Sequence, residues 1–270
     1  MTDGSKLRDD RDDTLVDHEG RPIDFGRTAS DYSTHRPDFP ESLFERASAL
    51  GWLRGPRTLD LGTGTGAVAR ALARRGLVVT GLDVSPEMVE AARARSAGAG
   101  ALDFVVGRAE ATGRPEGELD LVTAGQCWWW FDPKRTLAEV RRILKPNGRL
   151  LIMSFCYLAA PETIASRTEA IILHHNPGWR FSGMTGFFPE HLSDLERGGF
   201  VELETFSYDL EVPFSREAWR GRVRACNGVA ATLDEERVIA LDRDLEELLA
   251  PLPEPLSIRH RIFVATGVQG

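Results

Sequence analysis

Two carboxylates flank a run of alternating glycines in the first third of the chain. Asp60 stands two residues before Gly62, Gly64 and Gly66, and Asp83 ends the second apolar run that follows them. Glycines allow a tight turn and let a ligand touch the main chain. An acid about 20 residues beyond such a loop can accept both hydroxyls of a ribose. The spacing therefore predicts a site for a nucleotide or a nucleoside.

These groups must be positioned by a strand, a loop, a helix and a second strand. Residues 58–61 and 77–82 form apolar runs of strand length, and apolar residues recur at helical spacing over residues 67–72. The pattern places Arg70 and the two arginines that follow it on the opposite, polar face of the helix. We therefore expect a βαβ unit with its ligand site at the loop.

The loop leaves two ligand classes open. Residues 62–67 fit the dinucleotide pattern G-x-G-x-x-A, which suits NAD and hydride transfer. Asp60 favours another ligand, because a carboxylate there would repel a pyrophosphate but could hold an ammonium group, directly or through water. Gly66 also comes one position earlier than the third glycine of the dinucleotide fingerprint.

Composition narrows the classes of partner. The 270 residues suffice for one large domain or two small ones, and the net charge of -8 argues against a nucleic-acid substrate. Three widely spaced cysteines predict neither a disulfide framework nor a zinc site. No apolar run reaches membrane-spanning length, and no signal-peptide pattern is present. We expect a cytoplasmic protein with a small-molecule partner, no metal and no membrane contact.

Further candidate residues follow later apolar runs. Four aromatic residues in a row, Trp128 to Phe131, cannot all face one core, so some are expected to line a pocket; packing under a loop is the alternative. A helix is expected over residues 162–173, with His174 and His175 in the loop behind it. Either histidine could serve as a general base, although adjacent histidines also occur in ordinary polar loops.

The ordered set of motifs resembles the class I S-adenosylmethionine (SAM) methyltransferases. The D-x-G-x-G-x-G form of residues 60–66 resembles their motif I. L-K-P-N-G at residues 144–148, between a helix and an apolar strand expected over residues 149–155, is a further shared feature. The similarity is greatest to the ubiquinone and menaquinone biosynthesis and trans-aconitate methyltransferase-like group, and it covers residues 32–155. By this resemblance the cofactor is SAM, the glycine loop and Asp60 face its methionine part, and Asp83 holds its ribose.

The resemblance also implies a set of site residues. A segment Y-x-x-x-R-P closes over SAM in many relatives, which would place Arg36 near the methionine carboxylate. Relatives often carry a histidine where this chain has Trp129, and an acid where it has Arg108. Trp128, Trp129 and Trp130 are expected to line the substrate pocket. The expected cofactor residues are Tyr32, Arg36, Asp60, Gly62, Thr63, Gly64, Gly66, Asp83, Val84, Met88, Ala109, Glu110 and Gln126.

The fold implied is α/β: a Rossmann-like, doubly wound sheet of seven strands, the last antiparallel, with a lid or cap built from insertions. Residues 1–24 are expected to be a disordered acidic tail. Residues 25–270 are expected to form a single SAM-methyltransferase domain. Its core would cover about 40–156 and 189–270, with lid contributions from about 157–188 and 213–252.

The predicted function is methyl transfer from SAM to an oxygen, nitrogen or carboxylate of a small molecule, in a setting such as secondary metabolism. One alternative is a SAM-binding protein that transfers no methyl group. Another is an NAD-dependent oxidoreductase, and a nucleic-acid methyltransferase is disfavoured by the charge. The acceptor and the oligomeric state stay open.

Overall fold

The computed structural model describes Arg27, Asp31 and residues 34–270. The predicted tail over residues 1–24, and Tyr32, lie outside the described residues. The chain divides into two compact units. The first, here called the helical unit, holds the described residues up to Pro37 together with 156–186 and 209–261; the second, the sheet unit, holds 38–155, 187–208 and 262–270.

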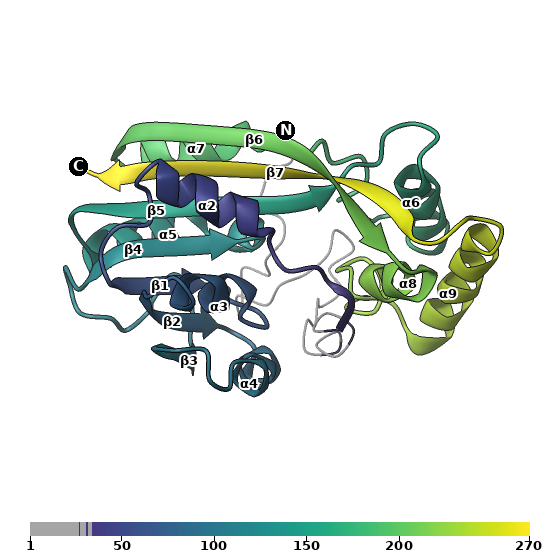
Figure 1. Cartoon of the computed structure of the whole chain (residues 1–270), viewed down its shortest axis with the longest axis horizontal. Helices are drawn as coiled ribbons and strands as arrows, with labels where there is room; N and C mark the ends of the chain where they lie inside the picture. The colour runs from purple at the N-terminus through teal and green to yellow at the C-terminus, as the bar shows by residue number, and fades with distance from the viewer. Residues whose placement is uncertain (1–26, 28–30, 32–33) are drawn as a thin grey trace. The chain divides into compact units, whose positions relative to one another are not determined.

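One seven-stranded sheet runs in the order β3-β2-β1-β4-β5-β7-β6 (Figure 1). β1 pairs in parallel with β2 and with β4, β2 pairs in parallel with β3, and β4 pairs in parallel with β5. β7 runs in the opposite direction, so the predicted α/β sheet with an antiparallel last strand is confirmed. The strands are β1 (Arg57–Leu61), β2 (Val78–Asp83), β3 (Leu102–Val106), β4 (Leu119–Gly125), β5 (Leu144–Tyr157), β6 (Phe200–Phe214) and β7 (Leu256–Gln269).

Helices cover both faces of this sheet in the sheet unit. Figure 1 shows α2 and α3 in front of the sheet and α5 and α7 behind it. The central strands are therefore buried on both sides, which explains their nearly continuous apolar sequences. The helices of this unit are α2 (Glu41–Ala49), α3 (Ala67–Ala73), α4 (Pro86–Arg95), α5 (Pro133–Ile143) and α7 (Pro189–Arg197), with a short 3₁₀ helix, η3 (Trp128–Trp130).

Side-chain caps fix where several helices begin. Ser85 accepts a hydrogen bond from the amide of Met88 at the start of α4, and Asp132 does the same for Arg135 at the start of α5. A proline follows each cap at the first helical position, where its missing N–H costs nothing. Ser-Pro and Asp-Pro are therefore local sequence signals for the starts of these two helices.

The helical unit has a hydrophobic core of its own. Its helices are α6 (Ile164–His175), α8 (Arg216–Arg224) and α9 (Glu235–Leu249). Trp219 of α8 lies fully buried in this core, and its indole N–H donates to the hydroxyl of Thr168 over 3.0 Å. A buried indole with a satisfied N–H contributes its large apolar area without a desolvation penalty.

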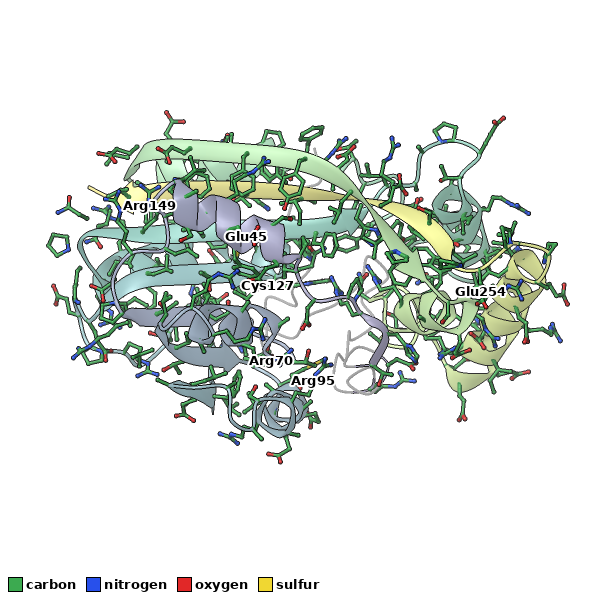
Figure 2. The ribbon with its side chains drawn as sticks, in the orientation of Figure 1. Glu45, Arg70, Arg95, Cys127, Arg149 and Glu254 are labelled. Atoms are coloured by element: carbon green, nitrogen blue, oxygen red, sulfur yellow. The ribbon has the colours of Figure 1, made fainter. Side chains whose placement is uncertain are left out.

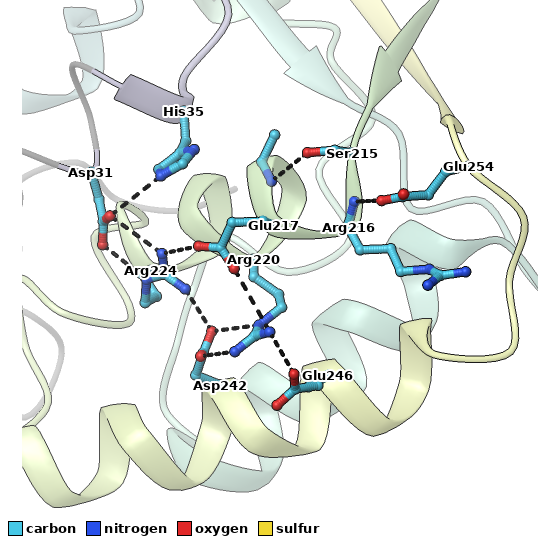
Figure 3. A network of polar contacts seen from close by, with 11 residues as sticks. Asp31, His35, Ser215, Arg216, Glu217, Arg220, Arg224, Asp242, Glu246 and Glu254 are labelled. Carbon is cyan, nitrogen blue, oxygen red and sulfur yellow. Dashed lines mark hydrogen bonds and ion pairs between the residues drawn. The ribbon is translucent and has the colours of Figure 1, made fainter.

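A network of ion pairs joins α8 to α9 and to the N-terminal segment (Figure 3). Arg224 pairs with Asp31 over 3.0 Å and with Asp242 over 2.8 Å. Arg220 pairs with Asp242 and with Glu246, the latter over 3.0 Å. Because each arginine pairs with three carboxylates, its side chain is ordered once for several ion pairs, unlike the side chains of an isolated surface pair.

Two details of the sequence prediction are wrong. β5 begins at Leu144 rather than Arg149, because Leu144 already pairs with Leu119; the ladder with β4 then shifts its register between Leu119 and Leu121, opposite residues 145–148. α6 continues through His174 and His175, which lie in its last turn and not in a loop. Thr163 caps this helix at its start, and the helix ends only at Asn176.

Two neighbouring valines of β2 allow a matched test of the core. Val79 is 2% exposed and Val78 is 51% exposed. Val79→Ala should lower the free energy of unfolding by about 2 kcal/mol, because it removes buried methyl groups and leaves a cavity. Val78→Ala should change it by less than about 0.5 kcal/mol. Urea denaturation measures both changes in free energy, and equal effects would contradict the burial described for the two valines of β2.

Candidate cofactor site

The glycine loop between β1 and α3 adopts a conformation that suits glycine. Gly62, Gly64 and Gly66 all have left-handed backbones, with φ of 57°, 55° and 81°. A Cβ atom on Gly62 would lie 2.8 Å from the Cβ of Cys127, and one on Gly66 would lie 2.8 Å from the ring of Phe104. The loop therefore presents main chain rather than side chains at this edge of the sheet.

Asp60 lies beneath the loop and is 1% exposed. One carboxylate oxygen accepts the hydroxyl of Thr63 over 2.6 Å, and the other accepts the hydroxyl of Thr123 over 2.7 Å. The pKa of Asp60 is raised to about 6, chiefly by burial and also by the nearby Asp83 carboxylate, against the lowering effect of the two hydroxyl donors. An acid so poised ionises fully when a cation approaches it.

Asp83 ends β2 beside the same loop. Its carboxylate accepts the amide of Gly64 over 2.8 Å and the amide of Ser85 over 3.0 Å. Burial raises the pKa of Asp83, against the effect of these two hydrogen bonds. The next residue, Val84, leaves 53% of its surface exposed, which is unusual for a valine that directly follows a buried strand. An acid and an apolar surface thus lie side by side at the strand end.

The candidate cofactor residues that follow β3 and β4 in the chain lie at the same edge of the sheet, where they form hydrogen bonds within the protein. The carboxylate of Glu110 accepts the amide of Asp132 over 3.1 Å, and the side-chain oxygen of Gln126 accepts the amide of Phe155 over 2.6 Å. Ala109 is buried. Met88, predicted at the cofactor, is buried on α4 in the hydrophobic core.

The three tryptophans form η3 and differ in burial. Trp128 is buried, and its indole N–H donates to the carboxylate of Asp194 over 3.0 Å. Trp129 packs near Phe188, with ring centroids 5.4 Å apart. Trp129 and Trp130 are half-buried. Of the predicted pocket wall, these two keep surface at which another molecule could pack, whereas Trp128 belongs to the core.

Cys127 lies buried against the glycine loop. Its thiol donates to the carbonyl oxygen of Leu61 over 3.2 Å. Burial raises the pKa of Cys127 well above its ordinary value, and the nearby carboxylates of Asp60 and Asp83 raise it further. A neutral, buried thiol packs as a small apolar group.

Two contributors are missing from the sequence prediction. Thr123 on β4 donates to Asp60, a contact that only the pairing of β1 with β4 brings about. Arg70 was expected on the polar face of α3, but it is buried: its guanidinium donates to the carbonyl oxygen of Thr65 and pairs with Asp38 over 3.5 Å. No pattern within residues 67–72 signals either contact.

The remaining candidates lie in the other unit or outside the described residues. Tyr32 belongs to the latter, and Arg36 lies in the helical unit. His174 and His175 also lie in the helical unit, where the ring nitrogen Nε2 of His175 is 2.7 Å from a carboxylate oxygen of Asp244. The roles expected for these residues stay predictions.

Comparison with known proteins identifies the family of this region. Residues 59–152 match the model of a methyltransferase domain. An uncharacterised methyltransferase of Mycobacterium tuberculosis is 37% identical over 131 residues, which cover 47% of this chain and 50% of that protein. The chain thus spans about half the length of the curated relatives it matches, 50% in this case.

Solved structures share the fold. A protein from Anaeromyxobacter dehalogenans, provisionally described as a type II methyltransferase, superposes with a TM-score of 0.60 at 21% identity, over 87% of this chain and 98% of its own. Phosphoethanolamine N-methyltransferase 2 of Haemonchus contortus, solved with phosphomonomethylethanolamine and S-adenosylhomocysteine, gives 0.50 at 18% identity, over 90% of this chain and 56% of its own. With the matched domain and the sheet order, these findings bear out the predicted class I methyltransferase fold and S-adenosylmethionine as its cofactor: residues 59–152 form a methyltransferase domain.

Proposed function

We propose that this protein transfers the methyl group of SAM to a small-molecule acceptor. The observation that carries the proposal is the pairing of Asp83 with Gly64: a carboxylate at the end of β2 is fixed against a left-handed glycine loop, within the matched methyltransferase domain. The net charge of -8 supports a small acceptor over a nucleic acid.

The residues of the sheet unit fit SAM. The glycine cradle leaves main chain open at positions where a Cβ atom would collide with Cys127 or Phe104. Asp83 would hold the ribose hydroxyls, and the exposed Val84 would cover a face of the adenine. The glycine loop and Asp60 would hold the methionine part. When bound, SAM supplies an electrophilic methyl group on a sulfonium.

The chain itself would contribute alignment and exclusion of water. A methyl group on a sulfonium is already activated, so holding the acceptor in line with it is the main task of the protein. A carboxylate acceptor needs no base. A hydroxyl or amine acceptor would benefit from one, and His174 and His175 remain the candidates for that role. We further propose a cytoplasmic location, and a setting such as secondary metabolism.

Transfer is distinguished from mere cofactor binding by its product. The purified protein is incubated with SAM carrying a labelled methyl group and a panel of phenols, amines and carboxylic acids. We expect S-adenosylhomocysteine (SAH) to form only when an acceptor is present. SAH binding without acceptor-dependent turnover over a broad panel would favour a SAM-binding protein that does not transfer methyl groups.

The acid of β2 is tested against an acid of the adjacent strand. Asp83→Ala should weaken SAH binding at least about tenfold, because a carboxylate that accepts hydroxyl hydrogen bonds is lost. Asp103→Ala on β3 should leave binding within about twofold, since its carboxylate is exposed and accepts the amide of Phe104. Calorimetric titration measures both, and NADH should give no heat of binding. Binding of NADH alone would instead support hydride transfer.

The raised pKa of Asp60 predicts a pH-dependent affinity. A ligand ammonium near Asp60 favours its ionised form, so binding lowers the pKa from about 6 and releases a proton. If the pKa falls by one unit, SAH affinity should rise about fivefold between about pH 5 and pH 7. Asp60→Asn should abolish this part of the pH dependence and bind more weakly above pH 6. An unchanged pH profile in the variant would place the ammonium elsewhere.

A further inference from the structure

Arg70 joins the glycine loop to a residue far from it in sequence. The arginine lies on α3 and is 6% exposed (Figure 2). One end of its guanidinium donates to the main-chain carbonyl of Thr65, the residue between the second and third glycines of the loop. The other end lies 3.5 Å from both carboxylate oxygens of Asp38.

The arrangement is unfavourable for the arginine unless both partners are present. Burial lowers the pKa of Arg70, and the charges of Arg95 and Arg74 lower it further, whereas the Asp38 carboxylate raises it. Thr65 is itself buried, so its carbonyl needs a partner from the protein. A buried guanidinium with a defined acceptor on each side holds both acceptors in one place.

Asp38 is held firmly in the sheet unit. The ring of the next residue, Phe39, lies against Gly125 at the end of β4, where an added Cβ would approach it to 3.2 Å. The same ring lies 6.0 Å from the ring of Phe155 on β5. Pro40 then begins α2, whose apolar face is buried. Asp38 therefore presents its carboxylate to Arg70 from a fixed backbone.

We propose that Arg70 and Asp38 are positioning residues for the methionine end of the cofactor, acting by holding the glycine loop in its binding conformation. This inference rests on the proposed function. A loop with three left-handed glycines has many other conformations available. Without the link through Thr65, the bound ligand itself must order the loop, and that ordering subtracts from affinity. The effect should concern the part of the ligand that faces the loop.

The test compares two ligands that differ in that part. SAH carries the aminocarboxypropyl group of methionine, and 5′-methylthioadenosine has the same adenosine and a thioether but lacks that group. Arg70→Met keeps the length of the side chain and removes its donors. It should weaken SAH binding about tenfold, as expected for a lost charge-assisted contact, and change 5′-methylthioadenosine binding by less than about twofold.

Arg75 provides a matched control on the same stretch of chain. It pairs with Glu41 of α2, much as Arg70 pairs with Asp38, but its guanidinium donates to the carbonyl of Ala71 in α3 instead of to a carbonyl of the glycine loop. Arg75→Met should therefore leave both affinities within about twofold of wild type. Equal weakening of both ligands in Arg70→Met would show a general structural defect and overturn the proposal, as would no change in either.

Two milder variants guard against misfolding. Asp38→Asn changes an exposed side chain and should weaken SAH about threefold with 5′-methylthioadenosine unaffected. Arg70→Lys retains a charge and a donor for Thr65, and should restore most of the SAH affinity lost in Arg70→Met. The link from Asp38 through Arg70 to Thr65 would be rejected if Arg70→Lys bound SAH as weakly as Arg70→Met and Asp38→Asn bound it as tightly as wild type. Failure of the wild-type protein to bind SAH would instead reject the proposed function.

Discussion

The buried carboxylate of Asp60 is the contact on which the site depends. It lies at the end of β1 and receives one hydroxyl from the glycine loop, through Thr63, and another from β4, through Thr123. A charge in such a place is costly, and the raised pKa of Asp60 expresses that cost. The two hydroxyls offset part of it and, in doing so, fix the loop relative to the centre of the sheet. Asp83 and Gly64 then complete the edge from β2.

Much of the fold can be predicted from local sequence patterns. The strands on either side of the glycine loop, the caps Ser85 and Asp132, and the antiparallel final strand all follow from short-range patterns or from the family resemblance they support. The errors have tertiary causes. Arg70 can be buried because its guanidinium donates a hydrogen bond to the Thr65 carbonyl and pairs with the Asp38 carboxylate. The K-P-N-G turn joins β5 because its flanking residues pair with β4. Neither Asp38, which is 32 residues from Arg70, nor β4 is visible in a window of ten residues.

The site shows the same division. Glycines, acids and their spacing predict which edge of the sheet holds the cofactor, whereas the contacts that hold this edge in place cannot be read from the chain. Glu110 and Gln126 illustrate the point, since both reach the expected edge but bind the main chain of Asp132 and Phe155 there. His175 is comparable in the helical unit, where Asp244 gives it a structural partner. Residue type predicts what a side chain can bind, and packing decides which partner it meets.

The burial of Cys127 has a consequence for a protein that handles an alkylating ligand. Sulfur is a strong nucleophile only as the thiolate, and a thiolate at this loop would compete with the acceptor for the reactive carbon. The carboxylates of Asp60 and Asp83 oppose ionisation of the thiol, which donates a hydrogen bond to the Leu61 carbonyl. With SAM bound at this loop as proposed, the two acids would therefore also keep the nearby thiol neutral and protect the protein from methylating its own cysteine.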